Sequence, residues 1–251
     1  MHHDCQRGLF VATLIGSIGC VATIGCQRST IEPPAAQTAL SESSTADEVT
    51  VPGKPPIRGR FRVAELPFDI VVFDTVFWEP RDSNSLRKLI HDTDLVRERT
   101  VMEIGTGSGL VALCCLQARA KRVLATDVNP NALKNTRYNA EMLKLLDGLE
   151  TRIVPLKDRS AFAVLQADER FDLIISNPPW EDQHPQSIDE YALYDQGFEL
   201  LDSLLSQLAD RLNPGVKALL TFAPVTAIKQ AIDPRRKYDL NDPQYDECTN
   251  E

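Results

Sequence analysis

The sequence predicts an α/β domain built on a mainly parallel sheet with helices on both of its faces. Apolar runs of strand length alternate with helical segments that are long enough to cross from one parallel strand to the next. A glycine-rich turn, GTGSG, directly follows the first of these strands. The run FDLIIS at 171–176 has almost no polar residue between its ends, which is typical of a strand buried on both faces.

Two short strands and a helix are expected to precede this alternation. The runs FRVAEL at 61–66 and FDIVVF at 68–73 are apolar and β-branched, and Pro67 separates them. This arrangement predicts a strand pair. The segment that follows has leucine and isoleucine residues on one face at helical spacing, and either Asp82 or Ser83 can cap it.

The alternation itself gives five strands and three helices. Strands are predicted at 100–104, 122–127, 152–156, 171–176 and 216–222, and helices at 110–119, 130–146 and 193–212. Asn129 caps the second of these helices, and Pro130 stands in its first turn, where a missing N–H costs nothing. The third helix has a leucine face that belongs to the core, and it ends at Asn213-Pro214-Gly215.

Composition limits the classes of function that the chain can have. Its 251 residues carry a formal net charge of -9, which disfavours non-specific binding to nucleic acids. The six cysteines include no C-x-x-C pair and have no histidine partners at zinc spacing. We therefore expect neither a metal site nor a disulfide framework.

The first 60 residues are expected to lie outside the catalytic domain. Gly8 to Cys26 is uncharged and mostly apolar, so residues 1–27 read as a signal peptide, a lipoprotein signal or a membrane anchor, unless the start codon is misassigned. Residues 28–60 are rich in proline and serine and predict a disordered tether. A catalytic domain at 61–233 and a polar tail at 234–251 complete the organisation.

The glycine-rich turn predicts a bound cofactor. Gly105, Gly107 and Gly109 let the backbone turn tightly and approach a ligand, and the helix after them offers unpaired N–H groups. Asp127 ends the second strand 24 residues after Glu103, close to the interval at which a carboxylate receives ribose hydroxyls.

The same turn departs from the dinucleotide pattern G-x-G-x-x-G, because Leu110 stands at its last position. Glu103 would repel a pyrophosphate and would attract a sulfonium or an ammonium group. A nicotinamide enzyme and a plain glycine turn without ligand remain as alternatives.

The tetrad Asn177-Pro178-Pro179-Trp180 predicts a substrate site at the carboxyl end of the buried strand. The asparagine oxygen and a proline carbonyl can accept both hydrogens of an NH2 group and so present its nitrogen to a methyl donor. Trp180 would supply a flat apolar surface for a planar amide or aromatic amine. The alternative is an ordinary turn with a core tryptophan.

Together these motifs resemble the class I methyltransferases of the small methyltransferase group, especially the HemK-type release-factor glutamine methyltransferases. The resemblance runs from about Val76 to Phe222 and rests on VFWEPRDSNSL, EIGTGSG, ATDVNPNAL and FDLIISNPPW. It implies a Rossmann-like fold and S-adenosylmethionine as cofactor, with Asn177, Pro178, Pro179 and Trp180 on the substrate. The implied cofactor-binding residues are Pro80, Arg81, Glu103, Gly105, Thr106, Gly107, Gly109, Asp127, Asp158 and Asn177.

Three departures affect the substrate assignment. The aromatic residue of the tetrad is usually Tyr or Phe in that family, the family's helical amino-terminal domain is replaced by the tether, and 234–251 is polar and unpatterned. The sheet is therefore expected to lack its last two strands, which would expose an edge.

The leading expectation is methylation of a protein glutamine, with a release factor or a ribosomal protein as partner. Methylation of an exocyclic amine of a nucleic acid, at adenine N6 or guanine N2, is the alternative. A tethered protein that binds the cofactor without turnover is the third possibility. The amino terminus points to membrane association or export, whereas the cofactor points to the cytoplasm.

Overall fold

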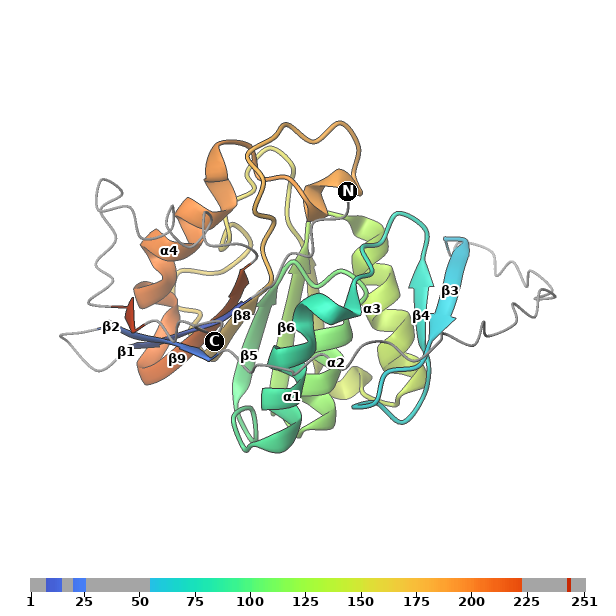
Figure 1. The fold of residues 1–251 in the computed structure, drawn as a ribbon, viewed down its shortest axis with the longest axis horizontal. Coiled ribbons are helices and arrows are strands. Elements are labelled where there is room, and N and C mark those ends of the chain that lie inside the picture. The colour runs from blue at the N-terminus through green and yellow to red at the C-terminus, as the bar shows by residue number, and fades with distance from the viewer. Residues whose placement is uncertain (1–7, 15–19, 26–54, 223–242, 245–251) are drawn as a thin grey trace, which may run out of the picture.

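A computed structural model describes residues 8–14, 20–25, 55–222 and 243–244. Its main feature is an eight-stranded sheet with the order β10-β2-β1-β9-β8-β5-β6-β7 (Figure 1). The parallel part consists of β5 (Thr100–Ile104), β6 (Arg122–Asp127), β7 (Leu149–Ile153), β8 (Phe171–Ser176) and β9 (Leu212–Phe222). Helices form the crossovers between these strands except from β7 to β8, where a loop connects them, so the predicted α/β class is confirmed.

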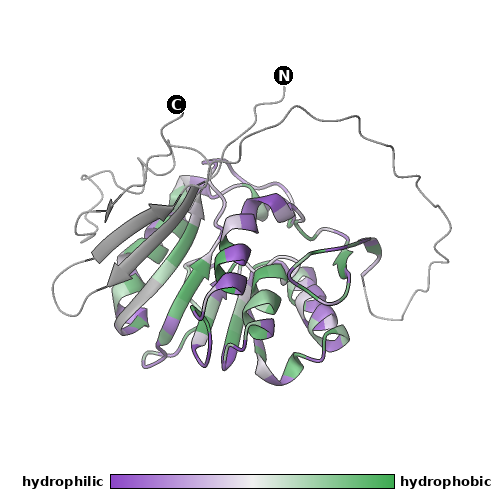
Figure 2. Cartoon of the chain, turned by 60° about the horizontal axis from the view of Figure 1, so that its bottom comes forward, coloured by the Kyte–Doolittle hydropathy of each residue, from purple (hydrophilic) through white to green (hydrophobic). Residues whose placement is uncertain are grey.

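Helices cover both faces of the sheet, and alternate residues of each strand point to opposite layers. On one face lie α1 (Asn84–Asp92), α2 (Leu110–Gln117) and α3 (Pro130–Met142), and on the other lies α4 (Glu199–Arg211). On β5, Val101 packs into the first layer and Met102 into the second. Figure 2 shows the hydrophobic central strands between helices whose polar residues lie outermost.

The strand pair at the outer side of α3 consists of β3 (Ile57–Phe61) and β4 (Ile70–Phe73), which are antiparallel. Two fully buried asparagines of α3 hydrogen-bond to the edge of β4 that has no neighbouring strand in the described part of the chain. Asn139 accepts from Val71 N (3.0 Å) and donates to Val71 O (2.9 Å), and Asn135 accepts from Phe73 N (2.7 Å). These side chains satisfy the buried edge of β4 and fix it against the helix.

Several predicted elements have different bounds. The first strand of the pair is Ile57–Phe61, not 61–66, and it begins before the predicted domain start. The third strand of the parallel sheet is Leu149–Ile153, not 152–156, because Pro155 has no N–H for the ladder. The predicted 193–212 helix forms only over Glu199–Arg211, and the last strand begins directly after it at Leu212, so 213–215 belong to a strand that was predicted only from 216.

The reason for this shorter helix is a change of backbone direction before α4. Gly197 and Phe198 both have positive φ angles (66° and 55°), which are incompatible with a continuing helix. The chain forms a 3-10 turn before them, η3 (Glu190–Ala192), and a second one that contains them, η4 (Gln196–Phe198). The leucine periodicity of 193–212 therefore continues across a break that only glycine signals in the sequence.

The edge beside β9 is covered by the amino-terminal segment. The strands β1 (Gly8–Leu14) and β2 (Cys20–Gly25) form an antiparallel pair, and β1 lies antiparallel to β9, with Phe10 opposite Leu220. The two-residue strand β10 (Pro243–Gln244) borders β2. The edge that sequence analysis expected to be open is thus paired.

The same segment was expected to supply a signal or an anchor helix. Its described parts are strands, and no helix in the described ranges has the length and apolar character needed to cross a membrane. Most of the predicted tether, and the tail apart from β10, lie outside the described residues.

Candidate functional site

The glycine loop and the tetrad leave the sheet side by side. Ile104 at the end of β5 is the register partner of Ser176 at the end of β8. The Ser176 hydroxyl donates to the Ile104 carbonyl over 3.0 Å. Gly105 directly follows β5 and Asn177 directly follows β8, so both residues lie at the same edge of the sheet.

The loop after β5 is a tight turn that requires glycine. Gly105, Gly107 and Gly109 all have positive φ angles, of 74°, 54° and 84°. A Cβ on Gly109 would come within 2.8–2.9 Å of Thr136 on α3, whereas a Cβ on Gly105 would meet no atom within 4 Å. Gly109 thus allows close packing against α3, and Gly105 has open space beside it.

Glu103 lies buried beneath this loop, with 4% of its surface exposed. Its Oε2 accepts from the Thr106 hydroxyl (2.6 Å) and from the Ala112 N–H of α2 (3.1 Å). Burial raises the pKa of the Glu103 carboxyl to about 8, against the opposing effect of those two hydrogen bonds. A positive charge brought into the cavity would favour its ionised form.

Asp127 at the end of β6 connects the glycine loop to the next turn. Its Oδ2 accepts from Gly107 N (2.9 Å) and its Oδ1 from Asn129 N (2.8 Å). Burial is the main cause that raises the pKa of this carboxyl. Each oxygen keeps a further lone pair, so the carboxylate can still accept hydroxyl donors from a ligand.

The segment before α1 is held against these turns. Asn129 Nδ2 donates to the Thr75 carbonyl (2.8 Å), and Asn131 Nδ2 to the Thr75 hydroxyl (3.1 Å). Trp78 stacks on Phe61 of β3, with ring centroids 4.8 Å apart. The residues from Thr75 to Pro80 therefore form one wall of the site.

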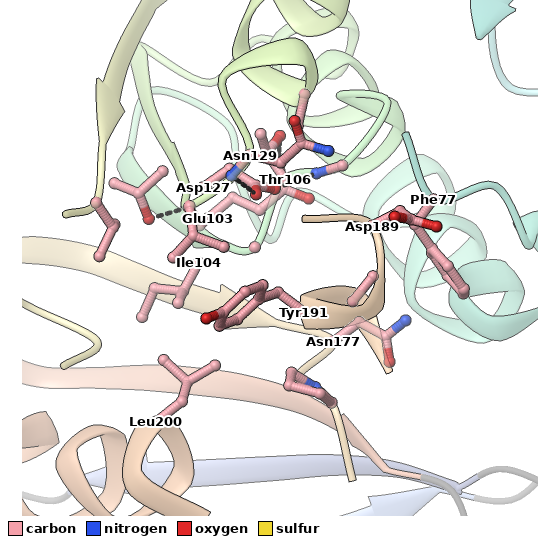
Figure 3. A pocket seen from close by; sticks show the side chains of 18 of the residues that line it. Phe77, Glu103, Ile104, Thr106, Asp127, Asn129, Asn177, Asp189, Tyr191 and Leu200 are labelled. Atoms are coloured by element: carbon pink, nitrogen blue, oxygen red, sulfur yellow. Dashed lines mark hydrogen bonds between the residues drawn. The ribbon is translucent and has the colours of Figure 1, made fainter. Parts of the chain in front are cut away.

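A single cavity contains both the glycine loop and the tetrad asparagine. Figure 3 shows Glu103, Thr106, Asp127 and Asn129 grouped on one side of it, with Tyr191, Asn177 and Leu200 across from them. Eight of the predicted site residues line this cavity: Pro80, Glu103, Gly105, Thr106, Gly107, Asp127, Asn177 and Pro179.

Five predicted site residues do not line the cavity. Arg81 and Asp158 are exposed, and Gly109 and Pro178 are packed behind the lining. Trp180 packs against the core layer under α4. The place that Asp158 was expected to take is lined by the next three residues, 159–161. The roles predicted for these five residues remain predictions.

Sequence reasoning missed the segment between β8 and α4, which closes the cavity from the substrate side. Tyr191 lines the cavity, and the Arg159 guanidinium lies 5.6 Å from the centre of its ring. Arg159 also donates to Glu199 at the start of α4 (2.5 Å). The only sequence signal for this wall is the set of aromatic residues within 188–194, whose spacing fits neither a helix nor a strand.

The same segment is fastened at its end by Asp195. The two carboxylate oxygens of Asp195 accept from Leu200 N and Leu201 N, each over 3.0 Å, in the first turn of α4. The Asp195 N–H donates to the Glu181 carbonyl (2.9 Å). The loop therefore begins at the tetrad and returns to it before the helix starts.

The cysteines and histidines of the described residues lie outside the cavity. Cys114 and Cys115 are buried in α2, and burial raises the pKa of the Cys114 thiol to about 12, so that thiol is protonated at neutral pH. His184 is exposed and pairs with Gln196 (2.6 Å). In the described part of the chain no group of three or more His, Cys, Asp or Glu residues is arranged to hold a metal ion.

Comparisons with known proteins agree with this arrangement. The family model of the methyltransferase small domain matches residues 76–202, just over half of the 251 residues. A release factor glutamine methyltransferase of Rhodopirellula baltica is 34% identical over 140 residues, which cover 51% of this chain and 46% of that protein. A putative protein N5-glutamine methyltransferase of Methanocaldococcus jannaschii is 26% identical over 62% of this chain and 77% of its own length.

A tRNA1(Val) (adenine(37)-N6)-methyltransferase of Shewanella loihica is 30% identical over 50% of this chain and 53% of that protein. The chain thus spans about half the length of two of these three relatives. The matched region 76–202 contains the glycine loop, Asp127 and the tetrad, which are the parts that meet in the cavity. The chain belongs to the methyltransferase small domain family.

Proposed function

We propose that the chain is an S-adenosylmethionine-dependent N-methyltransferase that acts on a planar amide or amino nitrogen. The observation that carries this proposal is the shared cavity of the glycine loop and Asn177. A methyl donor held by the loop and an NH2 group held by the asparagine would lie within one enclosed space, as a direct transfer requires.

The residues on the loop side fit S-adenosylmethionine. Gly105 has open space beside it, so a ligand can approach its backbone. Glu103 offers negative charge to a cationic ligand, and Asp127 offers acceptors to ribose hydroxyls. Bound there, the cofactor would supply an electrophilic methyl group on a sulfonium sulfur. Ile104 and Val111 provide apolar wall for the rest of the cofactor.

On the substrate side, we assign Asn177 and a proline carbonyl of the tetrad as acceptors for the two hydrogens of the substrate NH2. Accepting both hydrogens aims the nitrogen lone pair at the loop side. Tyr191 lines the cavity and Trp180 does not, so Tyr191 is the better placed aromatic surface for a planar group. Among the described residues no histidine lines the cavity, and the proton lost from nitrogen would pass to water.

The substrate that we favour is a protein glutamine. Two of the three relatives described above are named for glutamine, and the net charge of -9 disfavours tracking of a phosphate backbone. Methylation of an exocyclic adenine amine uses the same clamp and is supported by the name of the Shewanella relative.

The test is transfer of a radiolabelled methyl group from S-adenosylmethionine to an unmethylated release factor or to a tRNA1(Val) transcript. Label recovered as N5-methylglutamine after hydrolysis supports the favoured substrate. Label recovered as N6-methyladenosine replaces it with the nucleic-acid substrate. Calorimetric binding of the cofactor without label on either acceptor, or on any component of a lysate, would contradict turnover and leave a cofactor-binding protein.

We further propose, from the sequence, that the catalytic domain corresponds to 61–233 and that residues 1–27 are a targeting segment. Pairing of β1 with β9 is what a segment retained with the domain would form, whereas cleavage at Cys26 would remove both β1 and β2. Mass spectrometry of the mature amino terminus distinguishes a retained, a cleaved and a lipid-modified segment.

A further inference from the structure

The residue that faces the Asn177 side chain comes from β9. In the register of β8 with β9, Ser176 lies opposite Leu220, so the next residues of the two strands, Asn177 and Thr221, are neighbours. The Thr221 hydroxyl donates to Asn177 Oδ1 over 2.7 Å. Thr221 is almost fully buried, with 1% of its surface exposed, whereas Asn177 is partly open to the cavity.

This contact restrains the rotation of the Asn177 amide, with its oxygen on the Thr221 hydroxyl. In the described part of the chain no other group hydrogen-bonds to the Asn177 side chain. The terminal torsion of asparagine is broad and nearly two-fold, so an unheld amide exchanges the positions of its oxygen and its nitrogen. Only one of these two orientations offers an acceptor to a substrate NH2, because the other presents the amide's own N–H groups.

A threonine hydroxyl is suited to hold this amide. A carbonyl oxygen has two lone pairs, so Oδ1 can accept from Thr221 and still accept one hydrogen of the substrate. A hydrogen bond between buried partners also strengthens because water does not compete for it. Valine has nearly the same shape as threonine but removes the donor.

We propose that Thr221 is a positioning residue for methyl transfer, which restrains the Asn177 amide through Oδ1 for binding of the substrate nitrogen. The proposal rests on the function proposed above, in which Asn177 binds the substrate NH2. Thr221 does not line the cavity, so its effect passes through Asn177 and does not involve the cofactor. No motif in the sequence marks it, since it lies within a strand 44 residues after Asn177.

The experiment compares methyl transfer and cofactor binding in the full chain with Thr221→Val, Asn177→Ala and the double variant, using whichever acceptor becomes labelled. Thr221→Val should lower kcat about tenfold, the size of one lost hydrogen bond, and leave the Kd of S-adenosylmethionine unchanged. In the Asn177→Ala background the valine should have no further effect, because the two side chains act as one unit.

Two further comparisons keep structural damage apart from positioning. Thr221→Ser and Thr221→Ala both lack the methyl group, so a difference between them reports the hydroxyl alone, and serine should restore most of the rate. Thr100→Val is the matched control, because the Thr100 hydroxyl also donates to a side-chain oxygen, that of Asp172 (2.8 Å), at the opposite end of the sheet. Its kcat should stay within about twofold of wild type.

The outcomes separate this inference from the proposed function. If Asn177→Ala turns over as wild type does, the proposed function of Asn177 fails. If Asn177→Ala is impaired while Thr221→Val and Thr221→Ala are not, the function stands and the role of Thr221 is refuted. A valine effect that persists undiminished in the Asn177→Ala background would also refute it.

Discussion

Glu103 is the buried acid that a cationic cofactor would meet first, and its protonation links binding to pH. Because burial raises the pKa of its carboxyl to about 8, the empty site holds this group mostly protonated at pH 6 to 7. A sulfonium or ammonium ligand favours the carboxylate, so binding below pH 8 must release a proton. The affinity should therefore rise with pH and level off near pH 8.

Titration calorimetry tests this link. From pH 6 to pH 8 the Kd of S-adenosylmethionine should fall by up to about tenfold per pH unit, and Glu103→Gln, which keeps an acceptor for Thr106, should flatten that dependence. Proton release in buffers of different ionisation enthalpy should disappear in the variant. An equal pH dependence in both proteins would contradict the assigned pKa.

Asp127 and Asp158 provide a direct comparison between two acids expected to bind the cofactor. Asp127 lines the cavity and holds Gly107, whereas Asp158 is exposed outside it and accepts from Ser160 N (3.2 Å). Asp127→Ala should weaken cofactor binding by about 1.5 to 3 kcal/mol, the scale of hydrogen bonds to a charged group.

Asp158→Ala is the matched control and should change the calorimetric Kd less than about twofold. If Asp158→Ala lowers the affinity for the cofactor more than Asp127→Ala does, the ribose is not bound by Asp127.

At the scale of elements, two glycines of the same loop serve different purposes: Gly109 allows packing against α3, and Gly105 leaves space for the cofactor. Gly109→Ala places a Cβ within 2.8–2.9 Å of Thr136 at a φ of 84°, so it should lower the free energy of unfolding by about 2 to 4 kcal/mol. Gly105→Ala has free space and should lose only about 1 to 2 kcal/mol, but its new methyl group adjoins the cavity and should weaken cofactor binding more.

Urea denaturation and calorimetry of the two alanine variants check this pair. The account is contradicted if Gly105→Ala is the less stable protein, or if Gly109→Ala folds normally and loses more cofactor affinity.

The loop that closes the cavity depends on its attachment to α4. Asp195→Ala removes the acceptor for Leu200 N and Leu201 N, and the lost cap should lower the free energy of unfolding by about 1 to 2 kcal/mol. Asp210→Ala, an exposed acid near the other end of the same helix, should change it by less than about 0.5 kcal/mol. Equal losses in thermal or urea unfolding would mean that Asp195 does not fasten the loop.

Much of this fold follows from local patterns. The buried runs at 100–104, 122–127 and 171–176 were found at their true places, because strands covered on both faces exclude polar residues. The glycine loop and Asn177 were predicted to share one edge because each follows a strand of the same parallel sheet. Both line one cavity.

What the sequence could not reveal depends on tertiary contacts. Asn135 and Asn139 are ordinary polar helix residues until β4 lies beside them. Trp180 reads equally well as a substrate surface or as core, and packing under α4 decides its place. The register of β8 with β9, which brings Thr221 to Asn177, has no local signature at all.

For the whole molecule, the central claim is spatial: one cavity presents a methyl donor on the β5 and β6 side to an acceptor nitrogen at the end of β8. In the proposed reaction, holding both groups in one cavity is the main contribution to catalysis. The proposed substrate would then be selected by the walls formed by Thr75 to Pro80 and by the segment between β8 and α4.

A crystal structure of the full chain with bound S-adenosylmethionine tests this claim most directly. A reacting nitrogen about 3 to 3.5 Å from the methyl carbon, hydrogen-bonded to Asn177 Oδ1, requires that carbon to lie about 4 to 6 Å from the same oxygen. The account predicts this distance, with the ribose on Asp127. A cofactor bound outside the cavity, or bound with its methyl group directed away from Asn177, would contradict it.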